Sequence, residues 1–382
     1  MTKTALLAVL LAVSTWAAAA STPEDRLSHV FQSIEANRLD EALKRVDALI
    51  RDHPNFRLAH LVRGDLLLAR TRPLQTFGNV AKTVPPEKIE GMREEALARL
   101  RALRSRPAED RVPRQVLQLH SGQKHALLVD SKASRLYVFS NHGGRPRLIA
   151  DYYVTLGKNG VEKTREGDQK TPVGVYHVTA NLPRKKLTDF YGSGAYPINY
   201  PNELDRRLGR NGHGIWLHGV PSDVYSRPPR ASDGCIVLAN ADLDAVGRYV
   251  QVGLTPVIIA DEIEWSDPAT LEAERRSLAA AIEQWRADWE SRDTERYLSH
   301  YSAKFSDLAG WSAHKRKVNA GKRWIKVGMT EVSMFRYPRQ GDFVVVTFQQ
   351  DYRSDSLSNV MRKRQYWVKE GARWKILHEG AA

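Results

Sequence analysis

The chain of 382 residues contains a single cysteine, Cys235, within the stretch "PRASDGCIVLAN". A cysteine is an effective nucleophile only as a thiolate, so it needs a partner that lowers its pKa or accepts its proton. His218, in "GIWLHGV", lies upstream, and the intervening loop could bring the two together. Such a pair would perform nucleophilic acyl chemistry. The alternatives are another of the 12 histidines as partner, or a buried and inert thiol.

Small residues surround both positions. Gly219 follows the histidine and Gly234 precedes the cysteine, which allows the backbone to approach a substrate closely. The amides of Gly234 and Cys235 are therefore candidate donors to an oxyanion. Ser232 has two interpretations: it donates a hydrogen bond into the site, or it caps the turn.

Three aromatic residues are candidates for substrate binding. Trp216 lies two residues before His218, so on a strand both side chains share one face, where Trp216 lines a groove or packs in the core. Tyr196 and Tyr200, in "YGSGAYPINYPNELDR", offer hydroxyls to a peptide, with plain packing as the alternative. We find no metal-ligand spacing and no glycine-rich phosphate loop, so we expect neither a metal nor a cofactor.

The elements that must position these residues are strands. Short runs such as "ALLVDSKASRLYVFSN", "RLIADYYVTLG", "GVYHVTAN" and "TPVIIA" are separated by glycines and prolines. This pattern predicts mixed antiparallel β structure over 113–262. One helix is expected there, "NADLDAVGRYVQVG", directly after the cysteine stretch.

The N-terminus indicates export. Lys3, a short apolar run and a small-residue site ending at Ala20 are typical of a signal peptide over 1–20, with an uncleaved anchor as the alternative. No other run is long and apolar enough to span a bilayer. We expect the periplasm of a bacterium.

Residues 21–112 are rich in Leu, Ala, Arg and Glu with a helical period. Thr22 and Pro23 form an N-cap and first-position pair. The pattern resembles tetratricopeptide hairpins but covers little more than one repeat, which is too few to bury its apolar face alone. We expect it to pack on the next domain or on a second copy of the chain, as a homodimer.

Residues 266–382 predict helices followed by a curved antiparallel sheet, an α+β pattern. Leu278, Ile282, Trp285 and Trp289 form one apolar helix face. The segment resembles the cone-shaped nuclear-transport-factor-like (NTF2-like, or SnoaL-like) domains. Its basic and aromatic residues suit an anionic wall polymer or an envelope protein, or else simply divide between surface and core. They are Arg323, Trp324, Arg362, Arg364, Tyr366 and Trp367.

The formal net charge is +14, from 58 basic and 44 acidic residues. A basic exported protein is attracted to anionic surfaces. Nucleic acid is a poor candidate outside the cytoplasm, and no motif for it is present.

The pair "HG" at 218–219 and "SDGC" at 232–235 is similar to the signature of the YkuD family of L,D-transpeptidases. The stretch "KTPVGVYHV" and the tyrosine-containing segment at 191–206 resemble two further parts of that family, in the same order. The resemblance implies a β-sandwich with a Cys/His pair in a groove. It also implies that Cys235 is the nucleophile, that His218 is the base and then the acid, and that the Gly219 carbonyl orients the imidazole.

One position departs from the family pattern. The family usually has arginine two places after the cysteine, and this chain has Val237. The departure leaves the acceptor open.

The whole architecture is multidomain α+β: a helical piece, a YkuD-like domain and an NTF2-like domain. That combination resembles the helical-cell-shape L,D-carboxypeptidases. We expect an L,D-transpeptidase that acts on peptidoglycan tetrapeptide stems and transfers them to a stem or protein amine. The alternatives are a carboxypeptidase, which uses water as acceptor, and a non-catalytic wall-binding protein that retains only the fold.

Overall fold

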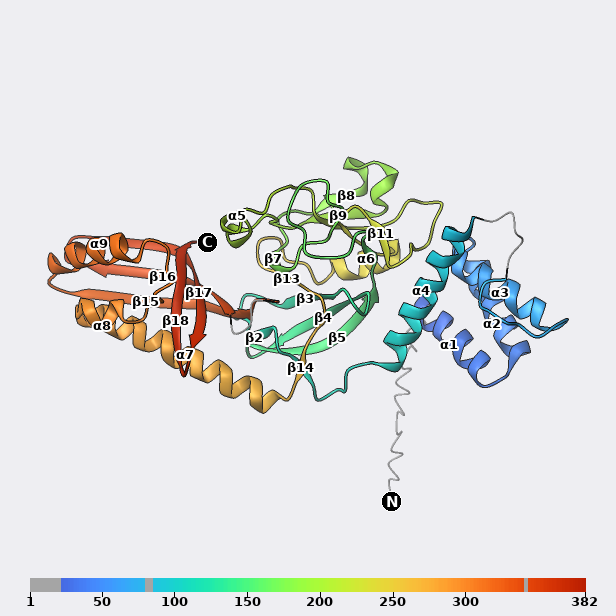
Figure 1. Ribbon diagram of the computed structural model, residues 1–382, viewed down its shortest axis with the longest axis horizontal. Helices are drawn as coiled ribbons and strands as arrows, with labels where there is room; N and C mark the ends of the chain where they lie inside the picture. The colour runs from blue at the N-terminus through green and yellow to red at the C-terminus, as the bar shows by residue number, and fades with distance from the viewer. Residues whose placement is uncertain (1–21, 80–84, 340–342) are drawn as a thin grey trace, which may run out of the picture.

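The computed structural model describes residues 22–79, 85–339 and 343–382. Helices lie at one end of the molecule, a β-rich domain lies in the middle, and a helix-and-sheet domain lies at the other end (Figure 1). The predicted multidomain α+β class is confirmed. The expected signal peptide at 1–20 lies outside the described residues. Within the described ranges, no helix has the length and apolarity needed to cross a membrane.

The N-terminal region is a small bundle. Its helices are α1 (Pro23–Glu35), α2 (Leu39–Asp52), α3 (Arg57–Ala69) and α4 (Pro86–Arg104). Thr22 caps α1 as predicted, because its hydroxyl accepts from the Asp25 amide at 3.1 Å. The bundle core includes Tyr225 and Ala239 of the middle domain, so the helices pack on that domain. A homodimer through these helices stays a prediction.

The middle domain contains two main sheets. The larger has the order β5-β4-β3-β13-β7, from β3 (His125–Asp130), β4 (Arg135–His142), β5 (Arg145–Tyr153), β7 (Gly174–His177) and β13 (Pro256–Ala260). The smaller has the order β12-β10-β9-β8, from β8 (Leu182–Pro183), β9 (Gly194–Pro197), β10 (Trp216–His218) and β12 (Ile236–Val237). A shared apolar core, including Leu127, Val138, Leu217, Ile236 and Val257, fills the space between them. The fold is therefore a β-sandwich whose smaller sheet carries the histidine.

Short elements complete this domain. They are β6 (Leu156–Gly157), which pairs with β11 (Arg230–Ser232), 3-10 helices at Arg184–Lys186 and Asp189–Tyr191, α5 (Glu203–Arg207) and α6 (Asn240–Gly247). Helix α6 is the helix predicted after the cysteine stretch.

The C-terminal domain wraps helices against a strongly bent sheet. Its elements are α7 (Pro268–Ser291), α8 (Thr294–Leu298), α9 (Leu308–Ala320), β15 (Ile325–Arg336), β16 (Phe343–Ser354), β17 (Ser358–Glu370) and β18 (Arg373–Ala381). The apolar face predicted on α7 is confirmed, since Leu278, Ile282, Trp285 and Trp289 are all buried.

The linking segments differ from the expectation in one detail. Strand β2 (Val116–Gln118) lies inside the range expected for the middle domain, but it forms the edge strand of the C-terminal sheet beside β15. Nearby, β1 (Val112–Pro113) pairs with β14 (Trp265–Ser266), so the chain entering the domain is joined to the chain leaving it.

The middle and C-terminal domains share a second apolar core. Phe335 and Tyr366, on the outer face of the C-terminal sheet, belong to the same buried cluster as Leu128 and Ile258 of the larger middle sheet. Each domain thus covers an apolar sheet face of the other.

Candidate active site

His218 and Cys235 are held by neighbouring strands. Strands β10 and β12 run parallel, with His218 opposite Val237, and Cys235 immediately precedes β12. Continued by one residue, this register puts Cys235 level with Trp216, on the face of the smaller sheet that also carries His218 two residues along.

The imidazole of His218 has a fixed orientation. Its Nδ1 donates to the carbonyl oxygen of Gly219 at 2.7 Å, because a carbonyl can only accept. This leaves Nε2 unprotonated and available as a base. The ring is buried, and burial lowers the pKa of His218 to about 4, with a smaller lowering from Arg227 and an opposing effect of the Gly219 carbonyl.

The thiol of Cys235 is half-buried and donates to the Gly214 carbonyl at 3.3 Å. Burial raises the pKa of Cys235. A backbone hydrogen bond from Trp216 and the charge of Arg227 oppose that rise only in part. Among the described residues, no hydrogen bond joins the sulfur to the imidazole. The resting pair is therefore a neutral thiol and a neutral imidazole, which makes His218 a proton acceptor and not a cation that lowers the thiol pKa.

Ser232 shapes the turn before the cysteine. Its hydroxyl donates to the Cys235 carbonyl at 2.7 Å and accepts from the Gly234 amide at 3.1 Å. Both hydrogen bonds are to the backbone of the turn, so in this structure Ser232 caps the turn. The Gly234 amide is thereby occupied, so the Cys235 amide is left as the better candidate for an oxyanion donor.

Gly234 is required by the backbone itself. Its φ of +123° lies in a region that residues with a side chain rarely adopt. A Cβ at this position would also lie 2.7 Å from the Lys170 carbonyl oxygen.

An aromatic cluster surrounds the imidazole. Tyr191 lies edge-on to His218, with ring centroids 5.2 Å apart, and stacks at a tilt on Trp216 at 4.9 Å. Phe190, which is 49% exposed, lies 5.7 Å from the imidazole. Trp216 thus reaches the surroundings of His218 as expected, and sequence reasoning missed Phe190 and Tyr191.

Tyr196 and Tyr200 do not join this cluster. Tyr196 is opposite Leu217 on the paired strand, which puts it on the face away from His218. Tyr200 is buried, and its hydroxyl donates to the Asn211 carbonyl at 2.9 Å. Both tyrosines have the packing role that was the alternative.

Asn240 joins the segment that follows His218 to the segment that carries Tyr191 and Ser193. Its side-chain oxygen accepts from the amides of Ser193 at 3.0 Å and Val220 at 3.1 Å. A side chain at Gly219 would collide with that oxygen. Packing therefore requires glycine after His218, in addition to any need for a substrate to approach the backbone there.

Arg227 places a positive charge near the cysteine. Its carbonyl accepts from the hydroxyls of Tyr153 and Thr155, each at 2.9 Å, and its guanidinium lies 5.0 Å from the centroid of Phe190. Val237, where the family has arginine, is buried. The only hint of this role in the sequence is that Arg227 lies in the loop between the two motifs, where Arg230 also lies.

The N-terminal helices hold the loop that carries Arg227. Tyr225 stacks on Phe56 with centroids 4.2 Å apart, and its amide donates to the Asn55 carbonyl at 3.2 Å. The next residue, Ser226, donates to buried Glu95 of α4 at 2.6 Å. The helical region therefore contributes to the support of the site.

In the part of the chain that the structure describes, no group of His, Cys, Asp and Glu side chains could hold a metal ion. The expectation that the chain uses no metal or cofactor stays a prediction.

Two family profiles match the chain. The YkuD profile, the L,D-transpeptidase catalytic domain, matches residues 124–259. The Cds6 C-terminal NTF2-like domain matches residues 277–380. No curated protein sequence matches the chain.

Solved structures match over both domains. Bd1075 from Bdellovibrio bacteriovorus is 30% identical, with a TM-score of 0.62, and the match covers 72% of this chain and 98% of Bd1075. The helical cell shape determining protein Pgp2 from Campylobacter jejuni is 25% identical, with a TM-score of 0.60, and the match covers 70% of this chain and 95% of Pgp2.

Proposed function

Because the chain belongs to the YkuD family, in the branch that joins an L,D-transpeptidase catalytic domain to an NTF2-like domain, we propose that it cleaves peptidoglycan stem peptides through an acyl-enzyme on Cys235. The observation that carries the proposal is the arrangement of His218. Its Nδ1 is bound to the Gly219 carbonyl, and its Nε2 is free to accept the proton of a cysteine on the neighbouring strand.

In the first step, His218 Nε2 accepts the thiol proton as Cys235 attacks the carbonyl of the third stem residue, which we take as meso-diaminopimelate. The Cys235 amide donates to the developing oxyanion. The amide bond then breaks, and the imidazolium returns the proton to the departing D-alanine amine. A thioester on Cys235 remains.

In the second step we propose water as the acceptor. His218 deprotonates the water, the thioester C–S bond breaks, and the products are a tripeptide carboxylate and the free thiol. Two observations favour this L,D-carboxypeptidase outcome. The first is the likeness to Pgp2, a helical cell shape determining protein, along nearly its whole length, and the second is Val237 in place of arginine.

Transfer to the amine of another stem or of a protein is the second candidate, and the family profile named for L,D-transpeptidases favours it. A non-catalytic wall-binding role is disfavoured, because such a protein would not need the oriented histidine beside a cysteine. The substrate implies that the chain works outside the cytoplasm. We propose the periplasm, with an effect on cell shape.

The test is muropeptide analysis of purified sacculi incubated with the full chain. The proposal predicts loss of tetrapeptides and an equal gain of tripeptides, with no new cross-links. New cross-links between third residues, or exchange of the terminal D-alanine for an added D-amino acid, would instead identify a transpeptidase. Unchanged muropeptides would refute both.

A further inference from the structure

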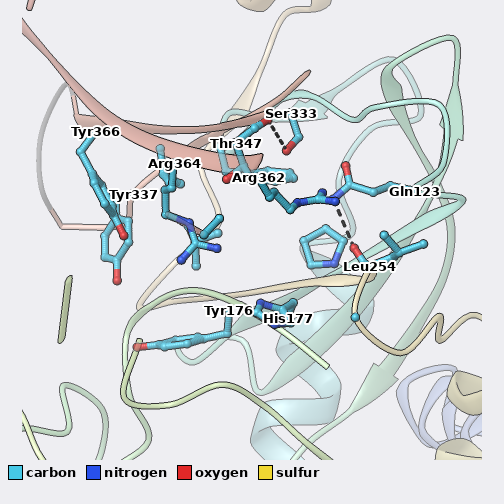
Figure 2. Close-up of a pocket in the computed structure, with 16 residues that line it drawn as sticks. Gln123, Tyr176, His177, Leu254, Ser333, Tyr337, Thr347, Arg362, Arg364 and Tyr366 are labelled. Carbon is cyan, nitrogen blue, oxygen red and sulfur yellow. Dashed lines mark hydrogen bonds between the residues drawn. The ribbon is translucent and has the colours of Figure 1, made fainter. Parts of the chain in front are cut away.

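A cavity of about 180 Å³ lies between the catalytic domain and the C-terminal domain. Strand β7 and the nearby loop form one wall, and the outer face of the C-terminal sheet forms the other. Arg362 and Arg364 extend from β17 toward Tyr176 and His177 of the catalytic domain, and Gln123 lies beside Arg362 (Figure 2). Neither Cys235 nor His218 lines this cavity, so it is not part of the site of the proposed reaction.

The strand alternation puts the two arginines on this face. Lys363 and Gln365, their neighbours on β17, point into the interior of the C-terminal domain and are buried. The rest of the outer face is largely apolar where it meets the catalytic domain, as Phe335 shows. Two like charges therefore lie together at a junction that is partly shielded from solvent, which is unfavourable unless an anion offsets them.

The charges around the cavity do not neutralise both arginines. Arg362 pairs with Glu331 at 3.2 Å. Within the described ranges, Arg364 has no carboxylate at ion-pair distance. Glu203 pairs with His378 at 2.6 Å, although the charge of Arg364 still helps to lower the pKa of Glu203, and the Arg364 side chain hydrogen-bonds the Tyr366 hydroxyl. Ala382 also lines the cavity, and its amide donates to the Arg362 carbonyl at 2.9 Å.

His177 completes the polar wall. Burial, and then the charges of Arg364 and Arg362, lower the pKa of His177 to about 4, so at neutral pH the imidazole is uncharged. The cavity therefore presents a guanidinium without an ion-pair partner among the described residues, a second guanidinium and a neutral imidazole to whatever enters it.

We propose that this interdomain cavity binds an oxyanion group, a carboxylate or a phosphate of an envelope molecule, through Arg364 and Arg362. A planar guanidinium binds either group with two parallel hydrogen bonds. The anion bridges the two domains, because the arginines come from one and His177 from the other. This site goes beyond the proposed function and is separate from the site of acyl transfer.

The experiment is a titration of the full chain carrying Cys235→Ala, which prevents turnover, followed by NMR of the histidine rings at neutral pH and constant ionic strength. The His177 signal is identified by its loss in His177→Gln. The probes are inorganic phosphate and N-acetyl-D-alanine, a minimal peptide carboxylate. We expect a saturable shift of the His177 signal, with half-saturation below about 10 mM.

Arg364→Gln should weaken that affinity by about 10-fold or more, since it removes charge-assisted hydrogen bonds. The matched control is Arg353→Gln, which removes the same charge from an exposed site on β16 and should leave the affinity unchanged. Arg364→Lys keeps the charge but loses the paired geometry, so it should fall between the two.

The two probes distinguish the sources of the anion. A shift with N-acetyl-D-alanine alone identifies a peptide carboxylate, a shift with phosphate alone identifies a phosphate group, and a shift with both supports a general oxyanion site. No saturable shift with either probe, or an equal affinity in Arg364→Gln, would overturn the proposal. Since Cys235 is absent from every sample, failure here leaves the proposed function untouched.

Discussion

A neutral thiol beside a neutral imidazole is the resting state that burial imposes on Cys235 and His218. A charge on either side chain would be poorly solvated, because the site is shielded from water. The proton therefore moves from sulfur to Nε2 only when a substrate carbonyl is present to receive the electron pair. This favours general-base catalysis over a preformed ion pair.

The pH dependence of the reaction follows from that state. The imidazole must be neutral to accept the thiol proton, and its pKa of about 4 means that protonation begins only at low pH. We predict that kcat/KM on a tetrapeptide stays constant as pH falls through 6.5 and declines only near pH 4. A decline centred near the ordinary histidine pKa of about 6.5 would contradict the buried, neutral His218.

Arg227 contributes a positive charge near Cys235, whereas Val237 contributes none. Because its charge favours the thiolate of Cys235, Arg227→Ala should slow acyl-enzyme formation by roughly 10-fold, the equivalent of about one pKa unit. Arg227→Lys should retain most of the rate. The control is Arg230→Ala, which removes an exposed arginine from the same loop. An equal loss of rate in this variant would show that Arg227 has no specific role.

At the scale of elements, the loop between His218 and Cys235 depends on the N-terminal helices. Tyr225 is the centre of that contact, since it is buried against Phe56 and bonded through its amide to Asn55. The helical region is thus joined to the site through a few residues of one loop.

Tyr225→Ala should loosen this loop. We predict faster amide exchange over 220–231 and a several-fold slower acyl-enzyme formation, together with a loss of about 3 kcal/mol in the free energy of unfolding. Tyr225→Phe keeps the stacked ring and should behave as the wild type. If the alanine variant exchanges at the wild-type rate, the helices do not support the site.

Cys235 and His218 could be predicted from the sequence because each lies in a short motif on neighbouring strands. Phe190 and Tyr191 could not, because Asn240 sets the position of their loop through a bond to Ser193, far along the chain. The sequence left two roles open for Tyr200 for a related reason: the loop carbonyl of Asn211, to which its hydroxyl donates, is brought to it only by the fold.

At the scale of the whole molecule, the catalytic and C-terminal domains form one packed body. They share a buried cluster, and β2 crosses from the first domain into the sheet of the second. The domain order could be predicted from composition and period. The crossing could not, because three residues of strand carry too little pattern to reveal their partner.

The shared core predicts joint unfolding. Calorimetry should show the two domains melting in one transition. Phe335→Ala opens a cavity at the junction, so it should lower the midpoint temperature of that transition and reduce the free energy of unfolding by about 3–5 kcal/mol. Trp324→Ala removes an aromatic ring that is 45% exposed and should have little effect. Two separate transitions, with only one moved by Phe335→Ala, would show independent domains.

The acyl-enzyme on Cys235 is the centre of this account, and intact-mass spectrometry tests it most directly. The full chain is mixed with a tetrapeptide muropeptide and quenched in acid within the first turnovers. We predict an adduct with the mass of the substrate minus D-alanine, located on the peptide that contains Cys235 and absent from Cys235→Ala. Turnover by Cys235→Ala, or an adduct on another residue, would contradict the account.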